Sequence, residues 1–515
     1  MTIDGVSGRT SYLGLSLTNI KGQLDTLTEQ LASGKKSTTY SGLGMDSAFA
    51  TSLRSQISML SGYQNTQTSL TTRIDVANLS LQGLIDMRAE VQKAATGSSQ
   101  VLNADHQTAG QQIGYASLTQ AIALLNTNSG GRYLFSGRAT DTPPTATVDA
   151  ILDGADGKDG LKTVISDRLI ADQGTGSMGR VATDATTTPG VVLVSEDAAG
   201  SPFGLKLSRI SSSINGAALS QPSSPDPATP SSESIDLTGA TLKEGDTVSF
   251  TFTLPDNTSE TVQLTVTNET PPPAGSFNIG ADPATTADNM KTALDSSIQT
   301  LVKGPLVAAS AMAAGQNFFD NPPQRVGGGS PVSPDATALV DDPDNTVQWY
   351  TGEQLDDPDA EARGTAVAQV DGSVVVSYGA TANETAFRNL LQNMAVFAAV
   401  TTTVDPSDPN GSVLANAQIS ALNQRVNTNL AVQPGTSSVE DIEAQFAGTQ
   451  AAVKSAGTRQ AQTKSMAQTM LDQIQGINDN EVAAKILALQ TSLQASYQTT
   501  ASLYQLNLLK FLPVG

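Results

Sequence analysis

The chain has 515 residues, a net charge of −21, 4% aromatic residues, a single His and no Cys. Its length exceeds that of one ordinary domain, so we expect several structural units. The absence of Cys excludes disulfides and thiolate chemistry. The negative charge argues against nucleic-acid or membrane-surface binding, because phosphate backbones and anionic lipids would repel it.

Nothing in the sequence predicts membrane insertion. No stretch approaches the ~20 apolar residues that a membrane-spanning helix needs. Residues 1–34 also lack the basic start, apolar core and small-residue cleavage site of a signal peptide. A secreted role would therefore require an export route that uses no cleaved signal.

Proline divides the chain into three parts. No Pro precedes Pro143, and Pro513 is the only one after Pro434. Because Pro inside a helix costs about 3 kcal/mol, both Pro-free arms are predicted to be helical. The Pro-rich middle is predicted to be different in structure.

The amino-terminal arm carries an apolar heptad pattern. Its apolar residues recur at alternating steps of four and three: Leu13, Leu17, Ile20, Leu24, Leu27 and Leu31. This spacing is typical of a helix that packs against a partner helix. Gly34 is expected to end the helix. A second helix of about 45 residues is predicted around Leu53 to Val91, and a third from about His106 to Asn128.

The carboxy-terminal arm shows a similar organisation. Helices are predicted from Phe387, from Ala415 to Leu430, and as one long helix from Ser437 onward. The last part of that helix carries a second apolar seam: Val482, Ile486, Leu489, Leu493, Leu503 and Leu506. The two ends thus offer complementary seams for pairing, either within one chain as an ordinary bundle or between chains during assembly.

The middle of the chain favours β-structure. Val248 to Leu254 and Val262 to Val266 alternate apolar and polar residues around a turn at 255–257, which predicts a β-hairpin. Residues 367–378 predict a second hairpin around Asp371 and Gly372. The Pro- and Ser-rich segment 222–232 is predicted to link two subdomains.

No residue pattern predicts catalysis, a cofactor or a metal centre. His106 has no second His to form a metal site or a catalytic triad. Asp153, Asp156 and Asp159 lie in a Gly-rich run that allows two interpretations, a calcium loop or tight Asp-Gly turns. We therefore expect a protein that is not an enzyme.

Segments near both ends of the chain resemble the flagellin family. Residues 30–36 (QLASGKK) resemble the motif that ends the first helix of flagellins, and residues 53–57 (LRSQI) follow where the family has a similar segment. Residues 486–497 and 506–512 are similar to the terminal helix shared by flagellins and hook-filament junction proteins. The resemblance covers about 145 residues at the start and about 130 at the end, and leaves the middle unmatched.

The resemblance implies an elongated architecture, mainly α at both termini, with the amino-terminal and carboxy-terminal helices paired and β-rich variable domains between them. Residues 1–45 and 466–515 would be inner-tube helices, and 46–145 and 381–465 would form the long-helix domain. Residues 146–380 would be variable outer domains, in two subdomains. The ends would be disordered in the free monomer and fold on assembly.

The implied function is self-assembly into the bacterial flagellar filament for motility. The implied partners are further copies of the chain, the hook-filament junction and cap proteins, an export chaperone and the type III export apparatus. The implied location is extracellular, without a cleaved signal peptide. Residues 131–137 and the Leu-rich ending are more similar to junction proteins, so that role is the alternative. A secreted surface adhesin is a third possibility.

Flagellins are also recognised by a Toll-like receptor through the long helix. Arg88 matches an arginine of that segment and Glu90 follows it, whereas Ala89 stands where an acidic residue is usual. The resemblance implies immune recognition at Arg88 and Glu90, which the change at position 89 weakens.

Overall fold

The structure is a computed structural model that describes residues 4–97, 99–222 and 229–509. About 53% of the chain is helical and 15% lies in strands. This confirms the mainly helical class with long helices at both ends. The chain forms two compact units: a terminal unit of residues 1–71, 368–376 and 450–515, and a middle unit of residues 72–367 and 377–449.

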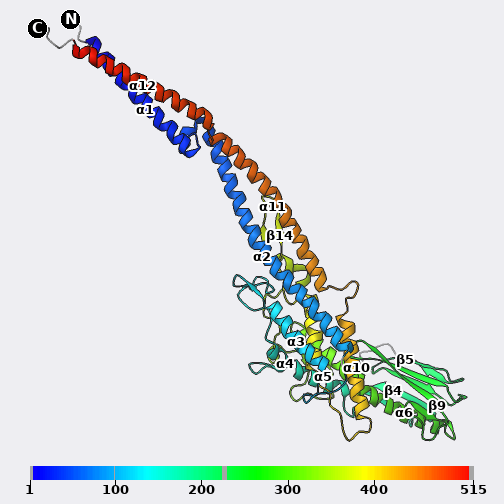
Figure 1. Cartoon of the computed structure of the whole chain (residues 1–515). Coiled ribbons are helices and arrows are strands. Elements are labelled where there is room, and N and C mark those ends of the chain that lie inside the picture. Colours follow the sequence, from blue (N-terminus) through cyan, green and yellow to red (C-terminus); the bar gives the residue numbers. More distant parts are fainter. Residues whose placement is uncertain (1–3, 98, 223–228, 510–515) are drawn as a thin grey trace. The chain divides into compact units, whose positions relative to one another are not determined.

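The terminal unit is built from long helices. They are α1 (Asp4–Ser33), the short 3-10 helix η1 (Tyr40–Asp46), the first part of α2 (Ser47–Gly97), most of α11 (Val439–Gln475), and α12 (Asp479–Leu509). Helix α2 has 51 residues, which confirms the predicted long helix. Helix α1 contacts α12, and the two lie alongside each other in blue and red in Figure 1.

The single long helix predicted from Ser437 onward is wrong, because the chain breaks between α11 and α12. Gly476 follows α11, and the Oδ1 atom of Asn478 accepts hydrogen bonds from the backbone N–H groups of Asn480 (3.2 Å) and Glu481 (3.3 Å). An Asn at this position satisfies the free N–H groups of a new helix. The prediction missed the break because apolar residues continue on both sides of it.

The middle unit contains further helices. They are α3 (Ala109–Leu125), α4 (Val148–Asp153), α5 (Leu161–Gln173), α6 (Pro283–Lys303), α7 (Pro305–Phe319), α8 (Pro358–Glu361), the 3-10 helix η2 (Ala362–Thr365), α9 (Thr385–Ala399) and α10 (Gly411–Leu430). Six of them, α4 to α8 and η2, lie in the segment that the sequence predicts as β-rich. Helix α3 is shorter than predicted and begins at a capping box formed by Thr108 and Gln111.

Helix α7 is the centre of the middle unit. It contacts α5, α6, α9 and α10. Its buried positions are mostly small, and include Ala308, Ala309, Ala311 and Gly315. A Cβ atom at Gly315 would clash with the side chain of Val396 in α9. Small residues let the backbones of α7 and its neighbours approach closely.

The middle unit also contains two four-stranded sheets. The first has the order β3-β4-β7-β6 and the second β10-β9-β8-β5. Their strands are β3 (Val181–Asp184), β4 (Val191–Glu196), β5 (Lys206–Ser212), β6 (Ala218–Ser220), β7 (Ser232–Asp236), β8 (Thr247–Thr253), β9 (Ser259–Thr267) and β10 (Ser276–Asn278). Helix α6 contacts strands of both sheets, and they share one apolar core with it (Figure 1).

Three small two-stranded sheets complete the fold. They pair β1 (Asn128–Ser129) with β2 (Arg132–Tyr133), β11 (Gln324–Val326) with β12 (Leu339–Asp341), and β13 (Val367–Gln369) with β14 (Val375–Ser377). The last pair confirms the predicted hairpin around Asp371 and Gly372.

The predicted hairpin of β8 and β9 is also confirmed. The strands are antiparallel, and Asn257 in the turn between them has a φ of +62°. Asn tolerates this left-handed conformation better than most residues. Arg425 of α10 holds the turn, because its Nε atom lies 2.6 Å from the Asp256 carboxylate and its Nη2 atom donates to Thr258.

The segment predicted to link two subdomains connects two strands of one sheet. Residues 223–228 of the segment lie outside the described residues. The flanking strands β6 and β7 are antiparallel neighbours in the first sheet. The sequence suggested a boundary here because Pro and Ser are frequent in linkers, but they also occur in connections within a sheet.

Glu233 of β7 is the least satisfied charged group in the sheet core. Glu233 is 1% exposed, and neither of its carboxylate oxygens has a hydrogen-bond partner among the described residues. It pairs across the strands with the buried Val194. Burial raises the pKa of the Glu233 carboxyl from 4.5 to about 7.

This pKa predicts a pH-dependent stability. The folded state holds the Glu233 proton more tightly than the unfolded state does, so the free energy of unfolding falls as pH rises from about 4.5 to about 7. Replacing the carboxyl with an apolar group of similar length, in Glu233→Met, is expected to raise the free energy of unfolding by about 3 kcal/mol at pH 8.

The check is thermal or chemical unfolding of both proteins at pH 4 and pH 8. We expect the gain at pH 4 to be much smaller than at pH 8, because Glu233 is already neutral there. An equal gain at both pH values would show that the charge of Glu233 does not limit stability.

Candidate assembly surface

The seam predicted for the first helix lies on α1. Its first five residues are partly buried and the sixth is exposed: Leu13, Leu17, Ile20, Leu24 and Leu27, followed by Leu31 at 41% exposure. Helix α12 is the neighbouring helix here. The seam of α1 is therefore only partly covered within one chain.

The second seam lies on α12. Val482 is buried, and Ile486, Leu489 and Leu493 are partly buried. Leu503 and Leu506 also lie in this helix, but their side chains fall outside the described ones. Like the seam of α1, this seam keeps apolar surface open to solvent.

Large apolar side chains off the seams are more exposed still. On α1 and α12 these side chains are Tyr12 (76% exposed), Leu15 (66%), Leu487 (64%) and Tyr497 (55%). Near the start of α2 they are Met45 (99%), which lies just before this helix, Phe49 (50%) and Met59 (55%). The heptad pattern did not predict these residues because they lie away from it. Apolar surface concentrated in one part of a protein favours association with another surface.

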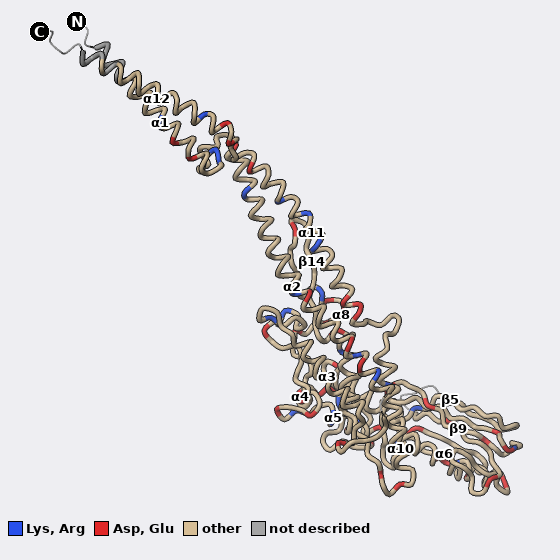
Figure 2. The backbone as a smooth tube through the Cα atoms, viewed as in Figure 1, with Lys and Arg blue, Asp and Glu red and all other residues tan. Residues whose placement is uncertain are grey.

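The two units differ sharply in charge. The terminal unit has 8 acidic and 10 basic residues, a net charge of +2, whereas the middle unit has 41 acidic and 18 basic residues, a net charge of −23. Between Ile486 and Leu509 the sequence has no charged residue, and in Figure 2 only the beginning of α12 carries charge colours. Association through the terminal unit would therefore bring together surfaces with little mutual repulsion.

The segment that resembles the flagellin motif connects the two ends of the chain. It ends α1, and its Lys36 backbone N–H donates to the carbonyl of Gln475 over 2.6 Å. The backbone N–H of Ile477 in turn donates to the carbonyl of Gly34 over 3.2 Å. Gly34 has a φ of +66°, a conformation that favours Gly. The break after α1 and the break after α11 are therefore hydrogen-bonded to each other.

Helices α2 and α11 contact each other within the terminal unit. Ala50 and Leu53 of α2 form a buried cluster with Ala467 and Leu471 of α11. Lys464 donates to the side chain of Gln64 over 2.9 Å. Here the apolar residues of the two arms are well covered, in contrast to those of α1 and α12.

A buried polar layer interrupts the contact between α2 and α11. Gln67 is 7% exposed and Gln460 is 2% exposed. The Nε2 atom of Gln67 donates to Gln460 (2.9 Å) and to the carbonyl of Val370 (2.7 Å), and the Nε2 atom of Gln460 donates to the same carbonyl (2.6 Å). Val370 lies in the hairpin between β13 and β14, so three chain segments meet at this layer.

Arg88 and Glu90, the residues of the possible receptor segment, differ in their surroundings. Arg88 is partly buried in the middle unit, and its Nη1 atom donates to Glu440 over 2.9 Å. Burial raises the pKa of the Glu440 carboxyl, but the hydrogen bond and charge of Arg88 outweigh this and leave the pKa below its ordinary value. Glu90 is exposed. Arg88 is therefore engaged within the chain.

The remaining candidate residues lie in turns. His106 is exposed, just before α3, with a φ of +60°. In the Gly-rich run, Asp153 pairs with Lys162 (2.6 Å) and Asp159 with Arg325 (2.6 Å). Asp156 occupies the left-handed region. These contacts fit the tight-turn interpretation of that run.

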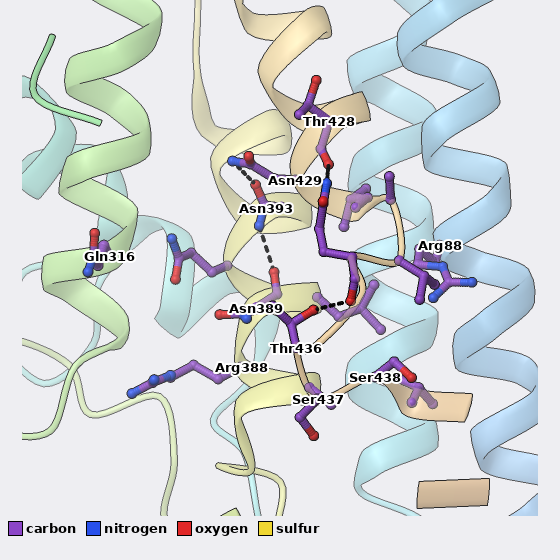
Figure 3. Close-up of a pocket in the computed structure, with 18 of the residues that line it drawn as sticks. Arg88, Gln316, Arg388, Asn389, Asn393, Thr428, Asn429, Thr436, Ser437 and Ser438 are labelled. Carbon is purple, nitrogen blue, oxygen red and sulfur yellow. Dashed lines mark hydrogen bonds between the residues drawn. The ribbon is translucent and has the colours of Figure 1, made fainter. Parts of the chain in front are cut away.

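Polar groups line a hollow of about 500 Å³ in the middle unit (Figure 3). Asn429 donates to Asn393 over 3.1 Å, and Asn393 donates to the carbonyl of Asn389 over 2.8 Å. Arg388 lies 3.7 Å from Asp320, whose pKa is raised by burial although Arg388 opposes the rise. The Asn393 and Asn429 amides bond to each other, and the Ser438 hydroxyl, which also lines the hollow, donates to the Asp441 carboxylate over 2.7 Å.

Within the described residues, no cluster of three or more His, Asp or Glu side chains could hold a metal ion. None of the helices in the described part of the chain is long and apolar enough to cross a membrane. No model of a known protein family matches the chain, and no curated protein matches its sequence. The resemblance to flagellins therefore depends on the short segments quoted above.

The buried Gln layer gives a testable prediction. Gln67→Leu would leave the Oε1 atom of Gln460 buried without a donor, which costs about 1–3 kcal/mol. We expect the terminal unit to lose that much stability, measured by hydrogen exchange of the α2 and α11 backbone in the full chain. Gln56→Leu is the control, because Gln56 is exposed on the same helix. Equal protection in the two variants would contradict the prediction.

Proposed function

We propose that the chain is an extracellular structural subunit that self-assembles into a bacterial flagellar filament and has no catalytic role. The observation that carries the proposal is the incomplete burial of the apolar seams of α1 and α12. In the described part of the chain α1 and α12 contact each other, and most of the described seam side chains still keep part of their surface exposed. Further copies of the same helices would complete that burial.

The charge distribution supports the same proposal. A subunit that carries −23 on its middle unit would be repelled by its copies if association used that unit. The terminal unit is close to neutral, and its α12 has a long uncharged stretch. Many weak contacts through this unit, repeated head to tail along a lattice, would give a stable polymer.

In the proposed architecture the amino-terminal and carboxy-terminal helices pair as inner tubes and the middle unit faces outward. The segment 30–36 supports this arrangement, because it both resembles the family motif and is hydrogen-bonded to the break between α11 and α12. The chain would leave the cell through a type III export apparatus with a chaperone. It would then contact the junction and cap proteins of the same appendage.

The first prediction concerns the seam of α1. Replacing Leu24 and Leu27 with Asp removes about 1.5–3 kcal/mol of apolar burial for each side chain that assembly would cover. We expect Leu24→Asp/Leu27→Asp to raise the critical concentration for polymerisation by at least roughly tenfold. Pelleting assays and electron microscopy of the polymer measure this.

The matched control is Asn19→Asp/Gln23→Asp, which adds the same charge at exposed positions of the same helix. Folding of the middle unit can be followed by the fluorescence of Trp349, the only Trp, which is 4% exposed there. Polymerisation of Leu24→Asp/Leu27→Asp at the wild-type critical concentration would contradict the proposal. So would equal loss in both variants, because the added charge alone would then explain the effect.

The second prediction separates the members of the family. We expect purified protein that is seeded or salted out to form long helical filaments in electron micrographs, because a filament subunit adds to its own end without limit. Short caps would instead indicate the hook-filament junction role. Protein that stays monomeric under all these conditions would favour a secreted adhesin.

A further inference from the structure

A second hollow in the middle unit differs chemically from the one in Figure 3. It has a volume of about 480 Å³ and lies between α2, strand β2 with the segment that follows it, and residues 365–367 and 378–380. Three guanidinium groups line it, those of Arg73, Arg132 and Arg138. No acidic residue lines it, whereas three other hollows of the same unit each include at least one carboxylate.

Two of the three guanidinium groups have no carboxylate partner among the described residues. Arg132 is exposed and forms no ion pair or hydrogen bond through its side chain with any described residue. Arg73 is partly buried, and its Nη1 atom contacts the Tyr378 hydroxyl at 3.4 Å. Only Arg138 is paired, with Glu353 at 3.0 Å. The hollow thus carries about two uncompensated positive charges in a unit of net charge −23.

Uncompensated arginines in a hollow fit one ligand chemistry well. A guanidinium group presents its N–H donors in a planar fork that matches the oxygens of phosphate or sulfate. Tyr133 and Tyr378 also line the hollow and add hydroxyl donors. A dianion would balance the charge of Arg73 and Arg132. The volume lies within the range of small-molecule sites, so it leaves room for an organic group attached to the anion.

We propose that this hollow is an oxyanion site that binds phosphate or sulfate, free or as the ester of a small molecule. Arg73 and Arg132 hold the anion, and Tyr133 and Tyr378 line the space beside it. The site does not depend on the proposed assembly, because all of these residues belong to the middle unit of one chain.

The test is isothermal titration calorimetry on the full chain at constant ionic strength in chloride. The probes are inorganic phosphate, inorganic sulfate, glucose 6-phosphate and glucose. We expect saturable binding of the three anions at one site and none of glucose. Tighter binding of glucose 6-phosphate than of phosphate would identify an ester as the preferred ligand, and equal binding would identify the free oxyanion.

Variants locate the site. Arg132→Gln is expected to weaken anion binding about tenfold, the loss of one charge-assisted contact. Arg73 is partly buried, so its variant is Arg73→Lys, which keeps the positive charge. This change removes the planar set of guanidinium N–H donors and should also weaken anion binding. Arg209→Gln is the matched control, because Arg209 is an exposed arginine of the same unit that lies outside the hollow.

Three results would overturn the proposal. The first is the absence of saturable binding by any of the three anions. The second is unchanged affinity in both Arg132→Gln and Arg73→Lys. The third is an equal loss of affinity in Arg209→Gln, which would show that the anions respond to the overall charge of the unit and not to this hollow.

Discussion

The need to bury an apolar helix seam is the constraint on which the terminal unit depends. Helices α1 and α12 carry few charges, so each is stable in water mainly through contact with another helix. The hydrogen bonds of Lys36 with Gln475 and of Gly34 with Ile477 align the breaks of both arms. Residues from opposite ends of the chain thereby form one compact unit.

Buried polar groups determine which elements meet. Apolar surfaces attract without direction, so they do not fix a register by themselves. In the terminal unit, Gln67 and Gln460 can satisfy each other and the carbonyl of Val370 in only one alignment of α2, α11 and the hairpin. In the middle unit, the buried Asp172 accepts from Arg168 of its own helix and from the backbone N–H of Gly204. A register shift would leave such groups unpaired, which is costly.

The sequence predicted those elements whose pattern is visible along the chain. Apolar and polar residues alternate along β8 and β9 because one face of each strand is buried. Apolar residues recur along α1 because one face of this helix meets a neighbouring helix. Helix α7 was missed because it is buried on nearly all sides, which erases any periodicity. The proposed anion site could not be predicted because Arg73 and Arg132 are distant in sequence and only the fold brings them together. By contrast, Met290, Leu294 and Ile298 give α6 a helical spacing that is visible in the sequence.

The separation of charge and apolar surface gives the proposed polymer a physical basis. A large net charge of one sign makes copies of a protein repel one another. That repulsion would oppose assembly if the charges were spread evenly. Here the acid excess lies in the middle unit, while the exposed apolar residues of α1 and α12 lie in a nearly neutral one. Copies that associate through the terminal unit would bury apolar surface at a small electrostatic cost, while their middle units would keep the polymer soluble.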